Sequence, residues 1–166
     1  MTDRPTGTVT FLFTDLEGST RLWEEHPDAM QGALRRHDEL LQHAVEAQGG
    51  YVVKTTGDGV HAAFATADAA VAAAIAGQRA LLEEAWGATG ALKVRMGLHT
   101  GAAELRDGDY YGPAVNRAAR LMAAAHGGQI VISNATEELV RDDLSPSVTL
   151  EDLGEHRLKD LGRAEH

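Results

Sequence analysis

Residues 51–64, YVVKTTGDGVHAAF, decide the fold of this 166-residue chain. Two strand-like runs, residues 51–55 and 60–64, flank residues 56–59, TGDG. Gly and Asp at the centre favour a tight turn, and the β-branched and aromatic residues on either side favour strands. The pattern therefore predicts a β-hairpin that carries the carboxylate of Asp58 at its tip.

The segments before and after the hairpin alternate between strand and helix patterns. Residues 8–14, TVTFLFT, resemble a buried strand that ends at Asp15, and residues 29–47 have apolar positions at helical spacing. Residues 67–86 are rich in Ala and Leu and predict a helix, and residues 92–100 alternate as a strand does. The order β-α-β-β-α-β is typical of the split βαβ, ferredoxin-like arrangement. This is an α/β (α+β) class in which helices pack on one face of an antiparallel-rich sheet.

The C-terminal third adds further α and β elements to this core. Gly108-Asp109 has the composition of a turn, and no repeat, low-complexity segment or linker interrupts the chain. We therefore expect one domain over residues 1–166. The additional predicted elements are a helix at 115–125, a strand at 129–133, a helix at 135–141 and a last strand at 147–153.

Composition excludes several classes of protein. The chain has no Cys, so disulfides, thiolate nucleophiles and Cys-ligated metals are excluded. Its net charge of -10 argues against nucleic-acid binding, which depends on clustered Lys and Arg. No apolar stretch approaches the roughly 18 residues that span a bilayer, and no signal-peptide pattern is present. We expect a cytoplasmic protein with no membrane or nucleic-acid partner, in which any metal is bound by oxygen or imidazole.

Two carboxylates are predicted to meet at one end of the sheet. If the first strand and the hairpin are neighbours, Asp15 and Asp58 lie at adjacent strand ends, where oxygen ligands suit a pair of hard divalent cations. Taken singly, Asp15 also reads as a helix cap and Asp58 as a turn residue. Gly18, Ser19 and Thr20 open the next helix, and its backbone N–H groups either hold a phosphate or are simply capped.

Four blocks of sequence carry the strongest functional signal: FLFTDLEGST at 11–20, KTTGDG at 54–59, VRMGLHTG at 94–101 and DYYGPAVNRAAR at 109–120. Together and in this order they resemble the class III adenylate and guanylate cyclase catalytic domain. The resemblance extends from Gly7 to about Gly162. It implies an adenylate cyclase, active in cyclic nucleotide signalling, that converts ATP to 3′,5′-cyclic AMP and pyrophosphate.

The resemblance implies a two-metal mechanism. By position, Asp15 and Asp58 bind two divalent cations, Mg²⁺ or Mn²⁺, and the carbonyl of Leu16 is a further ligand. One cation lowers the pKa of the ribose 3′-hydroxyl for in-line attack on the α-phosphate, and the other neutralises the triphosphate and the departing pyrophosphate. No separate protein base is then required.

The resemblance also assigns the purine contacts. Lys54 matches a position whose ammonium donates to adenine N1, and Asp109 matches a carboxylate that accepts from the 6-amino group. Guanine has the opposite polarity at these atoms, so the pair favours ATP. Without the motif, the preferred interpretation would be a solvated strand residue for Lys54 and a turn residue for Asp109. The alternative functions are a guanylate cyclase, a cyclase of relaxed specificity, and a nucleotide-binding module without turnover.

The remaining implied contacts are made to the ribose and the phosphates. Asn116 and Arg120 lie four residues apart on a predicted helix and match the Asn that orients the ribose and the Arg that stabilises charge on the α-phosphate. A structural ion-pair network is the competing interpretation. Arg95 and Lys159 match cations that hold the β- and γ-phosphates. Since the family's metal-binding and purine-binding residues reach one substrate from opposite subunits, the resemblance implies a symmetric homodimer with two shared sites.

Overall fold

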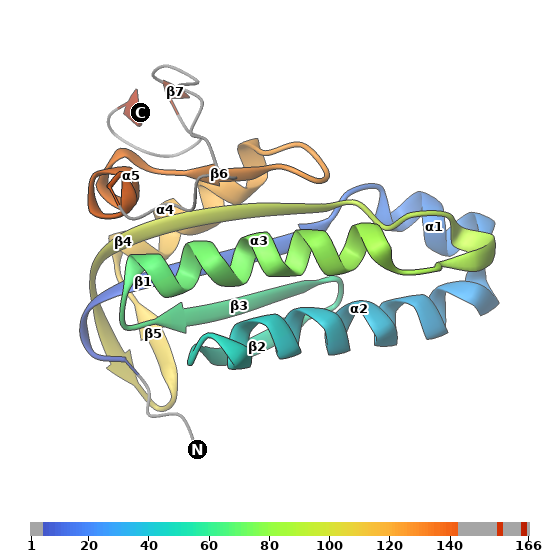
Figure 1. Cartoon of the computed structure of the whole chain (residues 1–166), viewed down its shortest axis with the longest axis horizontal. Helices are drawn as coiled ribbons and strands as arrows, with labels where there is room; N and C mark the ends of the chain where they lie inside the picture. The colour runs from blue at the N-terminus through green and yellow to red at the C-terminus, as the bar shows by residue number, and fades with distance from the viewer. Residues whose placement is uncertain (1–4, 143–155, 158–163, 166) are drawn as a thin grey trace.

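The computed structural model describes residues 5–142, 156–157 and 164–165 (Figure 1). Within them the predicted helices and strands occur in the predicted order, together with short strands at 109–111, 156–157 and 164–165 that the sequence pattern does not predict. The strand predicted at 147–153 lies outside the described residues. The strands are β1 (Gly7–Leu16), β2 (Tyr51–Thr56), β3 (Gly59–Phe64), β4 (Val94–Arg106), β5 (Asp109–Tyr111), β6 (Ile130–Ile132), β7 (His156–Arg157) and β8 (Ala164–Glu165). The helices are α1 (Ser19–Glu25), α2 (Pro27–Ala47), α3 (Ala67–Glu83), α4 (Pro113–Ala124) and α5 (Asn134–Val140), with a 3-10 helix η1 (Gly87–Thr89).

The main sheet has the strand order β2-β3-β1-β4-β5, and β6 pairs with β4 in parallel. The strands β2-β3-β1-β4 are connected as β-α-β-β-α-β, which confirms the predicted ferredoxin-like arrangement. β1 is antiparallel to β3 on one side and to β4 on the other, and its pairing with β4 runs from Gly7 opposite Ala103 to Leu16 opposite Val94. Because side chains alternate along a strand, the odd-numbered positions of β1 share one face of the sheet.

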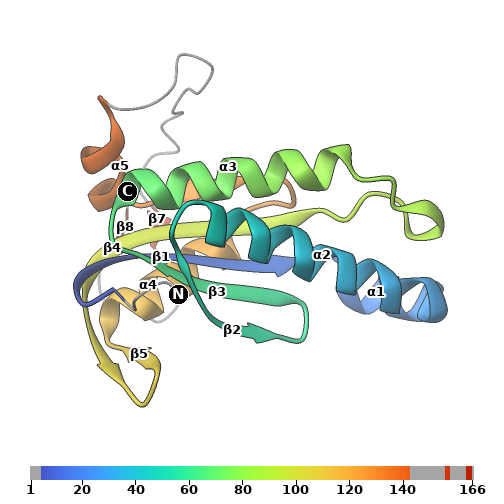
Figure 2. The same cartoon turned by 60° about the horizontal axis from the view of Figure 1, so that its bottom comes forward.

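Helices cover both faces of this sheet, whereas the sequence pattern predicts one covered face. α2 and α3 lie side by side on one face (Figure 1, Figure 2). The apolar cluster there includes Leu12, Phe64 and Leu98, each at most 2% exposed. α4 packs on the opposite face over Phe11 and Phe13. The sequence predicts the helix at α4 but not its side of the sheet, because that side is fixed by contacts with β4.

α4 approaches β4 closely because two positions of that strand have no side chain. A Cβ atom on Gly97 would overlap the backbone nitrogen of Met122, and one on Gly101 would lie 2.9 Å from the Cβ of Ala114. Packed atoms do not tolerate such separations, so only glycine lets the helix backbone rest on the strand. These two glycines belong to the block VRMGLHTG, and they set the distance of α4 from the sheet.

β4 continues to Arg106, beyond the end predicted at residue 100. Its last residues pair with β5, and the two strands form an arm at one end of the sheet (Figure 2). The predicted turn is also shifted by one residue: the chain reverses at Asp107 and Gly108, whose φ angles are 50° and 81°, and Asp109 is the first residue of β5. Asp109 is therefore a strand residue, and its direction is set by pairing with β4.

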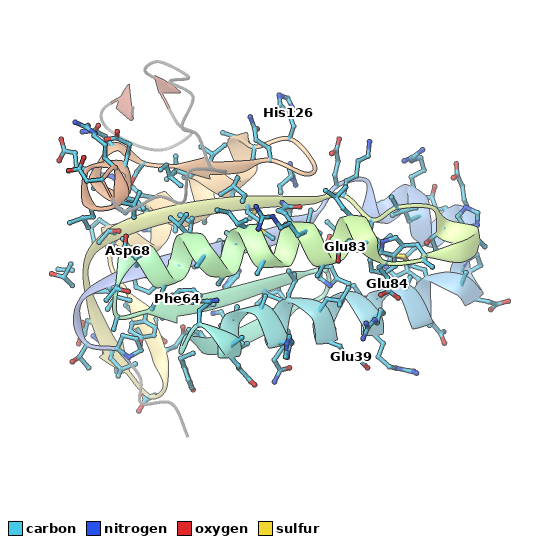
Figure 3. All side chains as sticks on the ribbon, in the orientation of Figure 1. Glu39, Phe64, Asp68, Glu83, Glu84 and His126 are labelled. Carbon is cyan, nitrogen blue, oxygen red and sulfur yellow. The ribbon has the colours of Figure 1, made fainter. Side chains whose placement is uncertain are left out.

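Charged side chains of the helical layer form ion pairs at its surface. Arg36 on α2 donates to Glu39 at 3.2 Å and to Glu84, which follows α3, at 3.1 Å. Figure 3 labels both glutamates. Exposed ion pairs contribute little in water, so the apolar cluster rather than these pairs holds α2 and α3 together. The helices of the described residues include none that is both long and apolar enough to cross a membrane.

Replacing Gly97 by Val is expected to destabilise the fold by about 1–3 kcal/mol, because the added atoms overlap the backbone of α4. The matched control is Gly32→Ala on α2, where an added Cβ has no atom within 4 Å. Alanine at that helical position should stabilise the protein by up to about 1 kcal/mol. Urea denaturation followed by circular dichroism measures both effects. Equal free energies of unfolding for Gly97→Val and the wild type would contradict the close packing of α4.

Candidate active site

One end of the sheet brings together the two carboxylates predicted to bind metal. Asp15 lies near the end of β1, and Asp58 lies in the turn between β2 and β3. This turn is held against β1: the backbone N–H of Val60 donates to Oγ1 of Thr14 at 2.9 Å. A Cβ atom on Gly59 would overlap the carbonyl oxygen of Thr14. Glycine at position 59 therefore allows the turn that carries one carboxylate to approach the strand that carries the other.

The guanidinium of Arg95 is hydrogen-bonded to one of these carboxylates and interacts electrostatically with the other. Arg95 lies opposite Asp15 in the register of β4 with β1, and its Nε and Nη2 donate to the two carboxylate oxygens at 2.6 and 2.5 Å. This bidentate bond raises the pKa of Arg95, and the charges of Glu17 and Asp58 raise it further. Asp15 and Asp58 therefore share one electrostatic site. The sequence analysis identified Arg95 as a phosphate-binding candidate but did not foresee its pairing with Asp15.

The donor atoms at this end of the sheet suit a hard cation that is bound together with a phosphate. Mg²⁺ is commonly held by one or two carboxylates plus substrate phosphates, and Asp15 and Asp58 supply such a pair. Leu16 can contribute only its backbone carbonyl, because a hydrocarbon side chain has no atom that binds a metal; this side chain is buried in the core. In the part of the chain that the structure describes, no three His, Asp or Glu side chains group closely enough to hold a metal by themselves. The donor set therefore fits a cation that takes its remaining ligands from a phosphate or from water.

The chain leaves β1 through a turn that begins a short helix. Gly18 has a φ angle of 71°, a left-handed conformation that favours glycine, and α1 begins at Ser19. The structure gives no side-chain hydrogen bond that caps α1 among the described residues, so the interpretation of this segment as a simple capping motif loses support. Ser19 is half-buried and Thr20 is exposed. All three residues stay candidates for phosphate binding through the backbone at the start of the helix.

A β-bulge in β2 turns Lys54 toward the face of the sheet that carries α4. Val52 pairs with Ala62 of β3 and packs toward α2 and α3. The next paired residue of β2 is Lys54, which lies opposite His61. Val53 is therefore one extra residue in β2. Since successive side chains of a regular strand point to opposite faces, Lys54 would share the face of Val52 without this insertion. The bulge therefore decides on which side of the sheet the ammonium lies.

Lys54 forms an ion pair with Asp109 from the other edge of the sheet. The Nζ to Oδ2 distance is 2.9 Å, and Oδ1 of Asp109 accepts a hydrogen bond from the backbone of Tyr110 at 2.8 Å. The bond from Lys54 is the main cause of a lowered pKa of Asp109. The two residues predicted to contact the purine thus meet beside a pocket with a cavity volume of about 80 Å³. Its lining residues are Phe11, Phe13, Val53, Lys54, His61, Asp109, Tyr110 and Val115.

His61 belongs to this pocket, and the sequence analysis missed it. Its ring is stacked on the ring of Phe13, with centroids 3.9 Å apart and planes 7° apart. Burial, and then the charge of Lys54, lower the pKa of His61, although Asp109 opposes this change. The imidazole is therefore neutral at neutral pH. Its position opposite Lys54 in the hairpin is the signal that could have identified it, but that register exists only because of the bulge.

The remaining predicted residues lie on α4, on β4 or beyond the described residues. Asn116 and Arg120 are one turn apart on α4, outside the face of the helix that is buried against the sheet. Their shared helix is confirmed, and their roles stay predictions. Lys159 lies outside the described residues. His99, which we expected to be packed or hydrogen-bonded, is buried and forms a hydrogen bond with Oγ of Ser133 at 2.7 Å.

Comparison with known proteins identifies the family of the chain. The family model described as the adenylate and guanylate cyclase catalytic domain matches residues 1–166. An uncharacterized protein of Mycobacterium tuberculosis is 44% identical over 163 residues, which cover 97% of this chain and 55% of that protein. An adenylate cyclase of Podospora anserina is 38% identical over 155 residues, which cover 78% of this chain and 7% of that enzyme. The crystal structure of the adenylyl cyclase CyaB from P. aeruginosa has a TM-score of 0.82 and 30% identity, with 96% of this chain and 91% of that chain covered.

The family match assigns the ferredoxin-like sheet, with its neighbouring carboxylates and its aromatic pocket, to the nucleotidyl cyclase class. In particular, the chain belongs to the adenylate and guanylate cyclase catalytic domain family. The chain spans 55% of the length of the mycobacterial relative, so it corresponds to only part of that protein. Because the family includes both adenylate and guanylate cyclases, membership alone does not define the base that is used.

The lowered pKa of His61 predicts a pH-dependent stability. Between this lowered pKa and about 6.5, the unfolded chain binds a proton at His61 that the folded chain does not, so the free energy of unfolding falls as the pH falls through this interval. His61→Phe removes this contribution, and we expect the variant to lose less stability than the wild type between pH 7.5 and 5.5 in urea denaturation. His43→Phe, at an exposed position on α2, should keep the wild-type dependence. Identical pH dependences for His61→Phe and the wild type would contradict this assignment.

Proposed function

We propose that this chain is the catalytic domain of an adenylate cyclase, which converts ATP to 3′,5′-cyclic AMP and pyrophosphate. The observation that carries the proposal is the Lys54–Asp109 ion pair beside an aromatic pocket. It lies on the same face of the sheet as Asp15 and Arg95, because Asp15 and the pocket residue Phe13 are both odd-numbered positions of β1. Membership of the cyclase family, and adenylate cyclases among the relatives, support this assignment.

The base is recognised by the polarity of the ion pair. The ammonium of Lys54 is a donor and the carboxylate of Asp109 is an acceptor, and adenine presents an acceptor at N1 beside a donor at the 6-amino group. Guanine presents a donor at N1 beside a carbonyl at C6, so in the same orientation both contacts would be mismatched. A site that hydrogen-bonds one polarity rejects the other because its buried polar groups are left unpaired. The pair therefore favours ATP over GTP.

The acidic end of the sheet is the proposed site of the phosphates and metals. Two divalent cations, Mg²⁺ or Mn²⁺, held by Asp15, Asp58 and the carbonyl of Leu16, would activate the ribose 3′-hydroxyl and offset the charge of the triphosphate and pyrophosphate. Arg95, with Lys159, supplies positive charge for the β- and γ-phosphates. A chain with a net charge of -10 needs such local cations to bind a polyanion.

The start of α1 and the outer face of α4 complete the proposed site. Gly18, Ser19 and Thr20 offer backbone N–H groups to the phosphates. Asn116 orients the ribose, and Arg120 stabilises the charge that develops on the α-phosphate, an effect worth roughly 3 kcal/mol for one well-placed donor. Because α4 rests directly on β4, these two side chains extend from a helix with a fixed position.

We further propose that the substrate binds between two copies of the chain. The pocket volume of about 80 Å³ is well below the roughly 300 Å³ or more of sites that enclose a whole ligand, so a second surface is needed to surround ATP. Lys54, Asp109 and Asn116 are partly or fully exposed, as expected for groups that meet a partner's substrate. In a two-fold dimer, the carboxylates of one subunit and the purine pocket of the other would form each of two sites.

The shared site predicts complementation between inactive variants. Asp58→Ala and Arg120→Ala are each expected to be nearly inactive, and mixing them should restore up to about a quarter of wild-type activity, because half of random dimers are mixed and each holds one intact site. Cyclic AMP formation after subunit exchange measures this recovery.

The matched control is a mixture of Asp58→Ala and Asp15→Ala. Both changes affect the same half of the site, so no mixed dimer contains an intact site and no activity should return. If a single chain used its own carboxylates together with its own pocket, neither mixture would recover activity, and the shared-site proposal would be wrong.

Lys54→Met tests the assignment of ATP as substrate, because methionine keeps the aliphatic stem and removes the ammonium. Loss of a charged hydrogen bond should lower kcat/KM for ATP by about 10- to 100-fold, and should leave the low rate with GTP nearly unchanged. Steady-state rates with each nucleotide, at equal metal concentration, measure the ratio. A wild-type preference for GTP would refute the base assignment. Absence of any cyclic product with Mn²⁺ would instead favour a binding module without turnover.

A further inference from the structure

We propose that His61 is a base-stacking residue: the outer face of its imidazole is the surface on which the purine lies while Lys54 and Asp109 contact the edge of the base. His61 follows the block KTTGDG and lies outside all four blocks that carry the resemblance to the cyclase family. The inference rests on the proposed function of the pocket and adds a contact to the face of the base.

Four rings line the pocket, and a flat ligand can reach one of them. Phe11, Phe13 and Tyr110 are 1%, 5% and 4% exposed, and Phe11 and Tyr110 pack edge to face with centroids 5.2 Å apart. His61 is partly exposed. One face of its ring is covered by Phe13, so a flat ligand in the pocket would have to contact the opposite face. Among the described residues that line the pocket, a base has no other exposed ring on which to stack.

The register of the hairpin places the ring of His61 next to Lys54, which is the residue proposed to contact the edge of the base. His61 and Lys54 are direct cross-strand neighbours, and the side chains of such neighbours begin about 5 Å apart. A purine that lies on the imidazole therefore has its edge near the ammonium and near Asp109, which is bonded to it. The same bulge that brings Lys54 to this face of the sheet thus also pairs it with His61.

The charge state of the ring suits a stacking role. With its pKa lowered by burial and by Lys54, the imidazole is neutral, so it adds no second cation beside the ammonium. The hydroxyl of Tyr110 donates to the carbonyl of Pro5 at 2.6 Å, so its proton is already bonded within the chain. Stacking tolerates any base because every base has a π face. His61 therefore contributes affinity, whereas Lys54 and Asp109 choose the base.

Two variants separate the planar surface of the ring from its volume. His61→Phe keeps a flat ring, and His61→Leu keeps a similar volume without one. We expect His61→Leu to raise the KM for ATP about tenfold, within the range for loss of one base-stacking contact, with little change in kcat. His61→Phe should keep KM within about twofold of the wild type. His43→Leu, at an exposed position on α2, is the control, and thermal melts followed by circular dichroism check folding.

Binding of a fluorescent ATP analogue, measured without turnover, should give the same order of affinities. An unchanged affinity in His61→Leu would overturn the proposal. So would an affinity in His61→Phe as low as that in His61→Leu, because the ring nitrogens rather than the flat surface would then carry the effect. The binding measurement is independent of catalysis, so it tests His61 even if the chain forms no cyclic AMP, a result that would contradict only the proposed function.

Discussion

Strand β1 is hydrogen-bonded on both sides, to β3 and to β4, and the positions of Asp15, Asp58 and Arg95 depend on this double pairing. The first pairing brings the turn of Asp58 to Asp15, and the second sets Arg95 opposite Asp15. A slip of one residue would move each of these side chains to the other face of the sheet. Apolar residues on both faces of β1, such as Phe11 and Leu12, oppose such a slip because each is buried under a different helical layer.

Two cations of the proposed site, Lys54 and Arg95, each form an ion pair with a carboxylate. Lys54 is bonded to Asp109 and Arg95 to Asp15, so their long side chains are already ordered. Ordering such side chains is one of the free-energy terms that oppose ligand binding, so the ordered Lys54–Asp109 pair lowers this cost. The Arg95–Asp15 pair has to open before Asp15 can bind a cation, because Arg95 occupies both of its carboxylate oxygens. Each pair also offsets the charge of one carboxylate where a polyanion has to approach. A net charge of -10 is thus compatible with nucleotide binding because the charge is unevenly distributed.

Local patterns predicted the hairpin, the ferredoxin-like order and the meeting of Asp15 with Asp58, because turn chemistry and side-chain period are properties of neighbouring residues. The rest depends on tertiary contacts. No local pattern separates the bulge at Val53 from a regular strand, so the partnership of Lys54 with His61 was not foreseen. The sequence pattern ends β4 too early because most residues after Thr100 are small or charged, and they are extended through pairing with β1 and β5. The chemical roles of the site residues stay predictions.

The glycines of β4 have a consequence for how this domain could vary between relatives. Position 97 accepts hardly any residue larger than glycine, because the backbone of α4 lies directly against it. The inward side of the helix therefore contacts the main chain of β4. The outward side, which carries Asn116 and Arg120, is not the side buried against the sheet. A substitution there would change the groups that the helix presents while its distance from the sheet stays fixed.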